Sequence, residues 1–227
     1  MVKTPVVDEL MHRLPGTIIL SVTSLIMMIV VSIPAGIYSA VKRGSWFDNL
    51  VRAFTFLGVS VPGFWLGLML MWGLALKLDL FPIIGGEISL ENLILPAVTL
   101  AVPMSAKYTR QVRTSVLEEL HQDYVVGARA RGMSEGYILW KEVLPNAMLP
   151  LITLLGLSLG NLLGGAAVIE MVFSWPGLGR LAIEAITYRD FQLIQGVVVW
   201  IALMYMLINL VVDISYSYLD PRLRKAR

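Results

Sequence analysis

The segment LPGTIILSVTSLIMMIVVSIPAGIYSAV, Leu14–Val41, contains no charged side chain over its whole length. An α-helix needs about 20 predominantly apolar residues to cross the hydrocarbon core of a bilayer, because it rises only about 1.5 Å per residue. This segment is longer than that minimum. It therefore predicts a transmembrane helix, which we place at residues 15–40.

Four further stretches without charge divide the rest of the chain. They run from Ala53 to Leu76, Asn92 to Ala106, Val143 to Ile169 and Phe191 to Val212. The shortest reaches spanning length if its helix continues past the next two basic residues, whose long side chains can extend to the membrane surface. A buried core helix could explain any one stretch but is a poor explanation of five. We therefore predict an all-α integral membrane protein with one domain, 1–227, and spans at residues 15–40, 53–77, 93–112, 147–170 and 194–216.

The composition agrees with a membrane protein and argues against several other classes. Hydrophobic residues make up 57% of the 227 residues and charged residues 15%. In a typical soluble domain about half of the residues are hydrophobic and about a quarter are charged. The net charge of +2 gives no reason to expect nucleic acid binding. With no cysteine and only two histidines, His12 and His121, no thiolate or His-rich metal site is expected.

The distribution of basic residues predicts the orientation in the membrane. Most of the 18 Lys and Arg residues fall between spans one and two, between spans three and four, or after span five. Basic residues in short loops mark the cytoplasmic side, so the segment before Pro145 and the C-terminus are expected there. Five spans then place the N-terminus outside, with no cleavable signal peptide. Because this order is awkward for insertion, we expect a further helix to precede the sequence; the alternative is a protein that begins outside.

The fourth predicted span contains a repeat of small residues. Gly156, Gly160 and Gly164 recur every four positions and share one helix face, which permits close approach of another helix. The spacing does not indicate whether that helix belongs to the same chain or to a second subunit. Ser158 and Asn161 of the same span either line a solute pathway or form a hydrogen bond with a neighbouring helix.

The outer side carries a second segment of interest, residues 173–195. Trp175-Pro176-Gly177 is a turn signal, and apolar residues then recur at helical spacing. We predict a short amphipathic helix on the outer surface, available as a lid or docking element. Glu170, at the outer end of the fourth span, is expected to be a solvated or paired carboxylate, with a functional role as the alternative.

The largest predicted cytoplasmic segment contains the polar sequence ARARGMSEGYILWKEVLP, Ala128–Pro145. Gly132 permits the left-handed conformation that commonly ends a helix, Ser134 can cap a second helix, and that helix is expected to stop near Leu144. The chain has no phosphate-binding loop, nucleophile–base pair or metal-ligand cluster. A helical hairpin over residues 121–145, held between two membrane spans, is suited to contact a protein partner.

The spacing of Ala128, Gly132, Leu144 and Pro145 is similar to that of the "EAA" loop of binding-protein-dependent ABC importer permeases. In that loop an alanine-rich run, a glycine and a distant Leu-Pro form a coupling helix. The stretches FLGVSVPGFWLG, LPAVTLAVP, FSWPGLGRL, YRDFQLIQG and LVVDISYSYLDPRLR resemble further blocks of the dipeptide, oligopeptide and nickel branch.

The chain also departs from the usual loop. Val126 and Gly127 replace the usual Glu-Ala, and Glu142 stands where isoleucine is usual, but these departures are themselves like that branch. The chain thus resembles the first permease subunit of the branch, whose members carry an additional N-terminal helix.

The resemblance implies a type I importer permease in the cytoplasmic membrane of a bacterium or archaeon. Two partner ATPase subunits would hydrolyse ATP, and their closure would move the hairpin Tyr124–Leu144. A second homologous permease, identical or different, would complete the pathway, and an extracytoplasmic solute-binding protein would deliver substrate. The chain itself would be non-catalytic and would bind no cofactor or metal.

The resemblance also indicates which hairpin residues carry the coupling. They are Ala128, Arg129, Ala130, Arg131, Gly132, Ser134, Leu144 and Pro145. Either Arg129 or Arg131 is expected to meet acidic groups on the ATPase.

Two other classes of protein fit the sequence less well. A secondary transporter or channel also uses kinked helices but more often buries ionisable residues at mid-membrane, whereas the four longest predicted spans are free of charge at their centres. A membrane scaffold or enzyme would need a large soluble face or catalytic polar groups. Among importers, the substrate is a di- or oligopeptide, or nickel or another metal as a chelate, and the sequence leaves this choice open.

Overall fold

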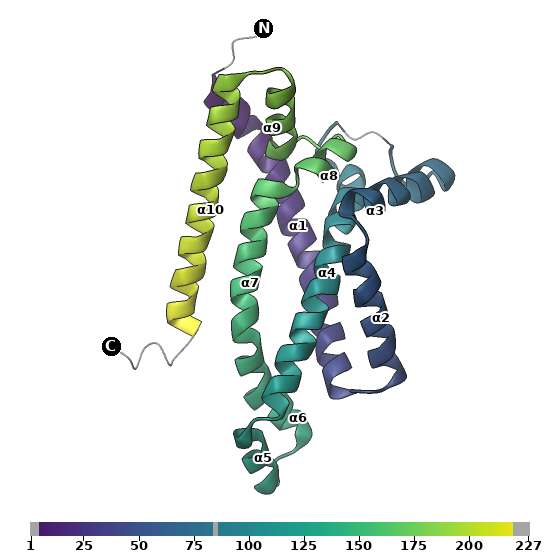
Figure 1. Cartoon of the computed structure of the whole chain (residues 1–227), viewed down its shortest axis with the longest axis vertical. Helices are drawn as coiled ribbons and strands as arrows, with labels where there is room; N and C mark the ends of the chain where they lie inside the picture. The colour runs from purple at the N-terminus through teal and green to yellow at the C-terminus, as the bar shows by residue number, and fades with distance from the viewer. Residues whose placement is uncertain (1–4, 84–85, 220–227) are drawn as a thin grey trace.

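The structure is a computed structural model that describes residues 5–83 and 86–219. Every regular element in these two ranges is a helix (Figure 1). In chain order the elements are α1 (Val6–Val41), α2 (Trp46–Ser60), α3 (Gly63–Leu70), η1 (Met71–Lys77), α4 (Leu90–Leu120), α5 (Asp123–Ala130), α6 (Glu135–Tyr137), η2 (Ile138–Val143), α7 (Leu144–Gly165), α8 (Ala167–Val172), α9 (Leu178–Thr187) and α10 (Phe191–Leu219). Both η elements are π-helical. The all-α class predicted from the charge-free stretches is confirmed.

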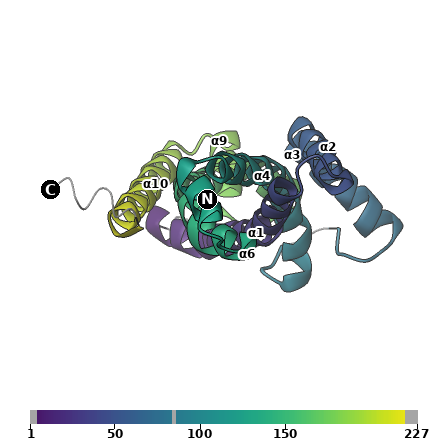
Figure 2. The same ribbon diagram turned by 90° about the horizontal axis from the view of Figure 1, so that it is seen from below.

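Helix α4 lies at the centre of the bundle. It packs against α1 and α7, and α2 and α3 cover it on one side, while α10 packs against α7 on the other side (Figures 1 and 2). The short elements α5 and α6 project at the lower end in Figure 1, and α8 and α9 lie at the upper end. The two ends of the bundle thus carry the two polar segments singled out from the sequence.

The contact between α1 and α4 depends on small residues. A Cβ atom added to Gly36 of α1 would lie 2.6 Å from Cβ of Val112 on α4, which is too close for any side chain. Thr17, Ser21 and Ser32 of α1 are also buried. Short side chains let two membrane helices approach closely, so van der Waals contact replaces the hydrophobic effect that lipid does not supply.

The helices differ in how well they meet the requirements for crossing a membrane. By length and apolar composition Val6–Val41, Glu135–Gly160 and Phe191–Val212 can each span, and α2 with α3–η1 forms a fourth if the bent pair is one span. Helix α4 is not among them. The predicted number of five spans therefore stays a prediction.

The second predicted span, 53–77, is broken in the structure. Helix α2 ends at Ser60, and the axes on either side of the break differ by 101°. Val61 is extended at φ −85° and ψ 126°, as sterics with the following proline ring favour, and Pro62 has no N–H to continue the helix. This bend divides the single span expected over 53–77 into two arms.

The fourth predicted span, 147–170, is also divided. Helix α7 ends at Gly165 and α8 begins at Ala167, so the chain turns at Ala166. Two consecutive glycines precede the turn and weaken the helix there, because glycine loses the most conformational freedom on folding. The first and fifth predicted spans lie within α1 and α10.

The small-residue face of α7 packs against α10 of the same chain. A Cβ atom on Gly156 would lie 1.9 Å from Cγ2 of Val212, and one on Gly160 would lie 2.7 Å from the ring of Tyr205. These two glycines therefore serve helix packing within the chain. The third glycine of the predicted repeat, Gly164, and the side chain of the predicted polar residue Asn161 lie outside the described residues.

Ser158 joins α7 to α4. Its Oγ lies 2.6 Å from the hydroxyl of Tyr108, which also donates to the carbonyl of Leu154. Of the two roles considered for Ser158, the structure has the hydrogen bond with a neighbouring helix.

We expect Gly160→Leu to lower the thermal unfolding temperature by on the order of 5 °C, because overpacking costs about 1–3 kcal/mol. The matched control is Gly73→Leu in η1, where an added Cβ meets no atom within 4 Å. Thermal unfolding of the detergent-solubilised protein measures both variants. Equal losses in the two variants would contradict the packing assigned to Gly160.

Candidate functional site: a polar hairpin and an outer clamp

The segment between α4 and α7 folds as a helical hairpin. It consists of α5, a turn at Arg131–Met133, then α6 and η2, and it runs without interruption into α7 at Leu144. The hairpin is joined to α4 by a short turn at His121 and Gln122 and continues directly into α7, so it is attached to both helices.

The turn of the hairpin is a Schellman motif. The N–H of Gly132 donates to the carbonyl of Arg129 at 2.9 Å, and the N–H of Met133 donates to the carbonyl of Ala128 at 3.3 Å. Gly132 has φ +77°, a conformation that favours glycine. Ser134 then accepts from the N–H of Tyr137 at 3.3 Å and caps the next helix. The sequence thus fixes both the end of α5 and the start of α6.

One side of the hairpin belongs to the protein core. The buried residues on that side pack with α4 and α7 in one apolar cluster, and they include Val125, Ala128, Ile138, Val143 and Leu144. Two of the predicted coupling residues, Ala128 and Leu144, therefore face the interior. Their small or apolar side chains are explained by packing, so a partner is not expected to touch them directly.

The other side of the hairpin is exposed. The predicted coupling residues found there are Arg129, Ala130, Arg131, Gly132, Ser134 and Pro145. Arg129 forms a two-pronged ion pair with Glu135, with Nε–Oε1 at 2.7 Å and Nη2–Oε2 at 3.1 Å. The hydrogen bonds raise the pKa of Arg129 and lower that of Glu135. Arg131 makes no ion pair with the part of the chain that the structure describes.

Tyr124 fastens the hairpin to the end of α4. Its hydroxyl donates to Oε2 of Glu119 at 2.6 Å and lies 3.4 Å from the carbonyl of Glu142. Burial, followed by the hydrogen bond to Glu119, raises the pKa of Tyr124 to about 12. The hydroxyl therefore keeps its proton and its donor role throughout the physiological pH range.

A buried ion pair that the sequence did not suggest lies between α2 and α4. Arg113 Nε and Nη2 contact Asp48 Oδ1 and Oδ2 at 2.7 and 2.9 Å, and Asp48 is 1% exposed. Asp48 also accepts from Ser39 Oγ at 2.6 Å and from the N–H of Gly44 at 2.9 Å. The carboxylate thus joins α1, the following turn and α4. Its 65-residue separation from Arg113 left no local signal in the sequence.

At the outer end, Glu170 is fully buried and hydrogen-bonded, so of the two expected states, solvated or paired, the structure excludes the solvated one. Its Oε1 accepts from Thr17 Oγ1 at 3.0 Å, and its Oε2 accepts from the N–H of Arg180 at 2.9 Å. Thr17 Oγ1 in turn accepts from the N–H of Leu178 at 2.7 Å. Glu170 and Thr17 together therefore satisfy N–H groups at the start of α9 that have no partner within the helix. We call these contacts the outer clamp.

The predicted outer-surface residues Trp175 and Gly177 are buried, which corrects that assignment. The indole N–H of Trp175 donates to the carbonyl of Gly16 at 2.9 Å, so the ring fits inside without an unsatisfied donor. A Cβ atom on Gly177 would lie 2.4 Å from the carboxyl carbon of Glu170, so only glycine leaves room for the carboxylate. Pro176 is half-buried.

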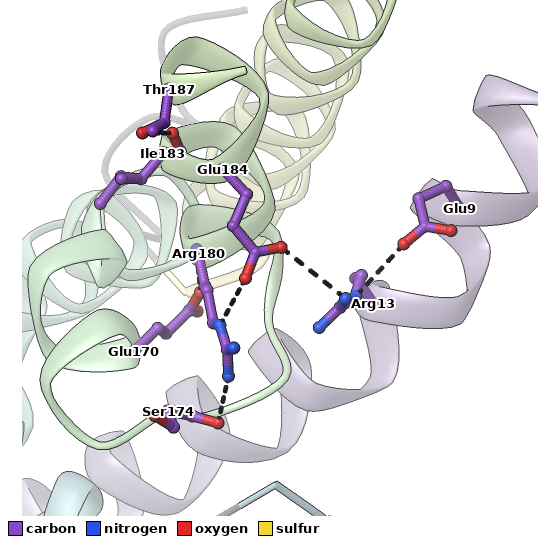
Figure 3. Close-up of polar contacts among 8 residues, drawn as sticks. All are labelled: Glu9, Arg13, Glu170, Ser174, Arg180, Ile183, Glu184 and Thr187. Carbon is purple, nitrogen blue, oxygen red and sulfur yellow. Dashed lines mark hydrogen bonds and ion pairs between the residues drawn. The ribbon is translucent and has the colours of Figure 1, made fainter. Parts of the chain in front are cut away.

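Charged residues extend the outer clamp to the surface (Figure 3). Arg13 of α1 lies 3.4 Å from Glu9 and 3.8 Å from Glu184 of α9, and Arg180 contacts Glu184 at 2.7 Å. Arg180 also donates to the carbonyl of Ser174 at 2.6 Å. Helix α9 is thus bound to α1 instead of lying free on the surface as the amphipathic pattern suggested.

The described residues contain no group of three or more His, Cys, Asp or Glu side chains that could hold a metal ion. The polar groups of the hairpin and of the outer clamp are arranged instead to hold helices together. The fold and these two ends define a helical membrane subunit with a polar hairpin built onto its core, an arrangement suited to a transport permease.

Comparison with known proteins identifies the family. Residues 32–225 match the family described as binding-protein-dependent transport system inner membrane component, and the chain belongs to this family. It is a permease subunit of an ABC importer.

Two curated relatives show similar identity over nearly the whole chain. The dipeptide transport system permease protein DppB of Alkalihalophilus pseudofirmus is 39% identical over 247 residues, covering 97% of this chain and 74% of the relative. The glutathione transport system permease protein GsiC of Escherichia coli K12 is 39% identical over 222 residues, covering 98% of this chain and 72% of the relative.

Solved structures share the fold. An inward-facing structure of the MetNI methionine ABC transporter matches with a TM-score of 0.75 at 20% identity, covering 97% of this chain and 100% of that chain. An amino acid ABC transporter matches with a TM-score of 0.67 at 17% identity, covering 95% of this chain and 94% of that chain.

We expect Glu170→Ala to lower the free energy of unfolding by about 3 kcal/mol, since it leaves the Thr17 hydroxyl and the Arg180 N–H buried without an acceptor. Thr17→Val keeps the shape but leaves the N–H of Leu178 and Oε1 of Glu170 without their partner, so we expect it to cost about 2 kcal/mol. Unfolding of the purified protein measures both. A loss below about 0.5 kcal/mol for Glu170→Ala is the size of an ordinary surface change and would contradict the outer clamp.

Proposed function

We propose that the hairpin, residues 121–145, receives the motion of partner ATPase subunits and transmits it to the membrane helices. The observation that carries this proposal is the apolar cluster in which hairpin residues pack directly on α4 and α7. A hairpin without a core of its own moves together with the helices that cover it. Among the described residues no metal cluster offers this chain a chemical task of its own, so transmission of motion is the role that its geometry favours.

The ion pair on the hairpin assigns different roles to its two arginines. Arg129 is engaged with Glu135 and holds α5 against α6. Arg131 is exposed and makes no ion pair within the described residues, so its guanidinium is available to an acidic group on an ATPase. Of the two arginines considered from the sequence, we therefore assign the intermolecular contact to Arg131.

The proposed assembly contains this chain, a second homologous permease, two ABC ATPase subunits and an extracytoplasmic solute-binding protein. Membership of a binding-protein-dependent transport family supports the ATPase and solute-binding partners. The second permease is proposed as the subunit that completes a pathway around the substrate, and the exposed apolar side chains of α10 are available to contact it. The assembly lies in the lipid bilayer of the cytoplasmic membrane, with the hairpin and the C-terminus in the cytoplasm.

We propose di- or oligopeptides as the substrates. Relatives that are 39% identical are named for dipeptide and for glutathione transport, and glutathione is itself a short peptide. These relatives do not favour the nickel alternative. Uptake of a radiolabelled dipeptide and of nickel, measured side by side in a deletion strain carrying this gene, tests the assignment. Nickel uptake without dipeptide uptake would overturn it.

We expect Gly132→Pro and Ala128→Trp to abolish substrate uptake and the ATP hydrolysis that the binding protein stimulates, while the chain still inserts into the membrane. Proline cannot adopt φ +77°, and it has no N–H to donate to the carbonyl of Arg129. An indole at Ala128 does not fit a site that is 1% exposed. Gly86→Ala is the matched control, because an added Cβ there meets no atom within 4 Å. Unchanged uptake in both hairpin variants would contradict the proposed coupling role of the hairpin.

A charge-exchange experiment separates the two arginines. Arg129→Glu or Glu135→Arg alone places like charges together, so we expect uptake to fall roughly threefold to tenfold. The double exchange restores an opposite pair and is expected to restore most of the uptake. Arg131 has no ion-pair partner among the described residues of the hairpin. We therefore expect uptake by Arg131→Glu to stay low when it is combined with either Arg129→Glu or Glu135→Arg. Failure of the double exchange to recover would assign the intermolecular contact to Arg129 instead.

A further inference from the structure

A cleft between α2 and α4 collects positive charge. It has a volume of about 680 Å³ and is lined by Arg52 of α2 and by Arg110 and Arg113 of α4. Polar side chains such as Asn49 and Thr114 also line it. No acidic side chain is among its lining residues in the described part of the chain.

Within the part of the chain that the structure describes, one of the three arginines is neutralised by an ion pair. Arg113 is paired with the buried carboxylate of Asp48. Arg52 and Arg110 are exposed, and neither forms an ion pair with the described residues. A neighbouring cleft of about 700 Å³ shares Arg52 and Arg113 and adds Arg43, but Asp48 and Glu118 also line it and offset two of its three positive charges. The excess positive charge therefore lies between Arg52 and Arg110.

The same cleft opens onto an apolar surface. Phe56 lines the cleft and is 72% exposed, and Val59, one turn further along the same face of α2, is 47% exposed. Two free guanidinium groups thus stand beside a strip of apolar side chains on a membrane helix. This pairing matches an amphiphile with an anionic head and apolar chains, whereas an inorganic anion would use the arginines alone.

We propose that this cleft binds the phosphate of an anionic phospholipid, with the acyl chains lying along α2. Arginine suits this role because its planar guanidinium donates two parallel hydrogen bonds to phosphate. Basic pockets between membrane helices recognise anionic headgroups in this way. The proposal requires only that the helices lie in a membrane and does not depend on the identity of the transported substrate.

The test is native mass spectrometry of the intact transporter complex with phosphatidylglycerol, phosphatidylcholine or glycerol phosphate added. We expect phosphatidylglycerol to bind the wild type and to bind the double variant Arg52→Gln/Arg110→Gln about 30-fold more weakly, since each basic residue contributes about a factor of five. The control Lys42→Gln/Lys141→Gln removes the same charge from exposed positions outside the cleft and is expected to bind like the wild type. Arg52 and Arg110 are exposed, so their replacement leaves the core intact.

Three results would overturn the proposal. Equal weakening in the lysine control would assign the binding to overall charge, and equal binding of phosphatidylcholine would show that the anionic headgroup is not recognised. Binding of glycerol phosphate as tight as that of phosphatidylglycerol would make the cleft a site for free phosphate. None of these results bears on uptake, so failure here is distinct from failure of the proposed transport function.

Discussion

One apolar cluster holds the hairpin to the membrane helices. It joins α1, α4, α5, η2 and α7, and Ile138, Val143 and Val116 within it are fully buried. The hairpin is too short to bury a core of its own, so its stability comes from this contact. The same contact ties the hairpin to the bundle, and this packing is the physical basis of the transmission of motion proposed above.

The outer end is fastened by a different kind of interaction. There a buried carboxylate, Glu170, replaces apolar packing and satisfies N–H groups at the start of α9 through hydrogen bonds. Such a network is costly to disturb, because every buried polar group left without a partner loses its solvation. The two joints of the molecule are thus different contacts: apolar packing joins the hairpin to the bundle, and buried hydrogen bonds join α9 to the outer end of α1.

The sequence was informative wherever a local rule acts. Long stretches without charge predicted the helices of the bundle, because lipid tolerates few charges, and the conformational freedom of Gly132 placed the end of α5. The clamp formed by Thr17 and Glu170 could not be predicted, because 153 positions separate the two residues. Pro62 indicated a break but not a bend of 101°, since that angle depends on how α2 and α3 pack on α4. The repeat of Gly156 and Gly160 predicted close packing, but only the fold identifies α10 as the helix that fills it.

Helix α4 connects the two joints. Its 31 residues make a rod about 46 Å long at about 1.5 Å per residue. Near one end Arg113 is fixed to Asp48, and near the other Ala97 packs in a cluster with Trp175 of the outer segment. A tilt of about 10° in a rod of this length displaces its far end by about 8 Å, more than the rise of one helical turn. In the mechanism proposed above, the central helix would act as a lever, so that a small rotation applied through the hairpin becomes a larger movement at the outer end of the bundle.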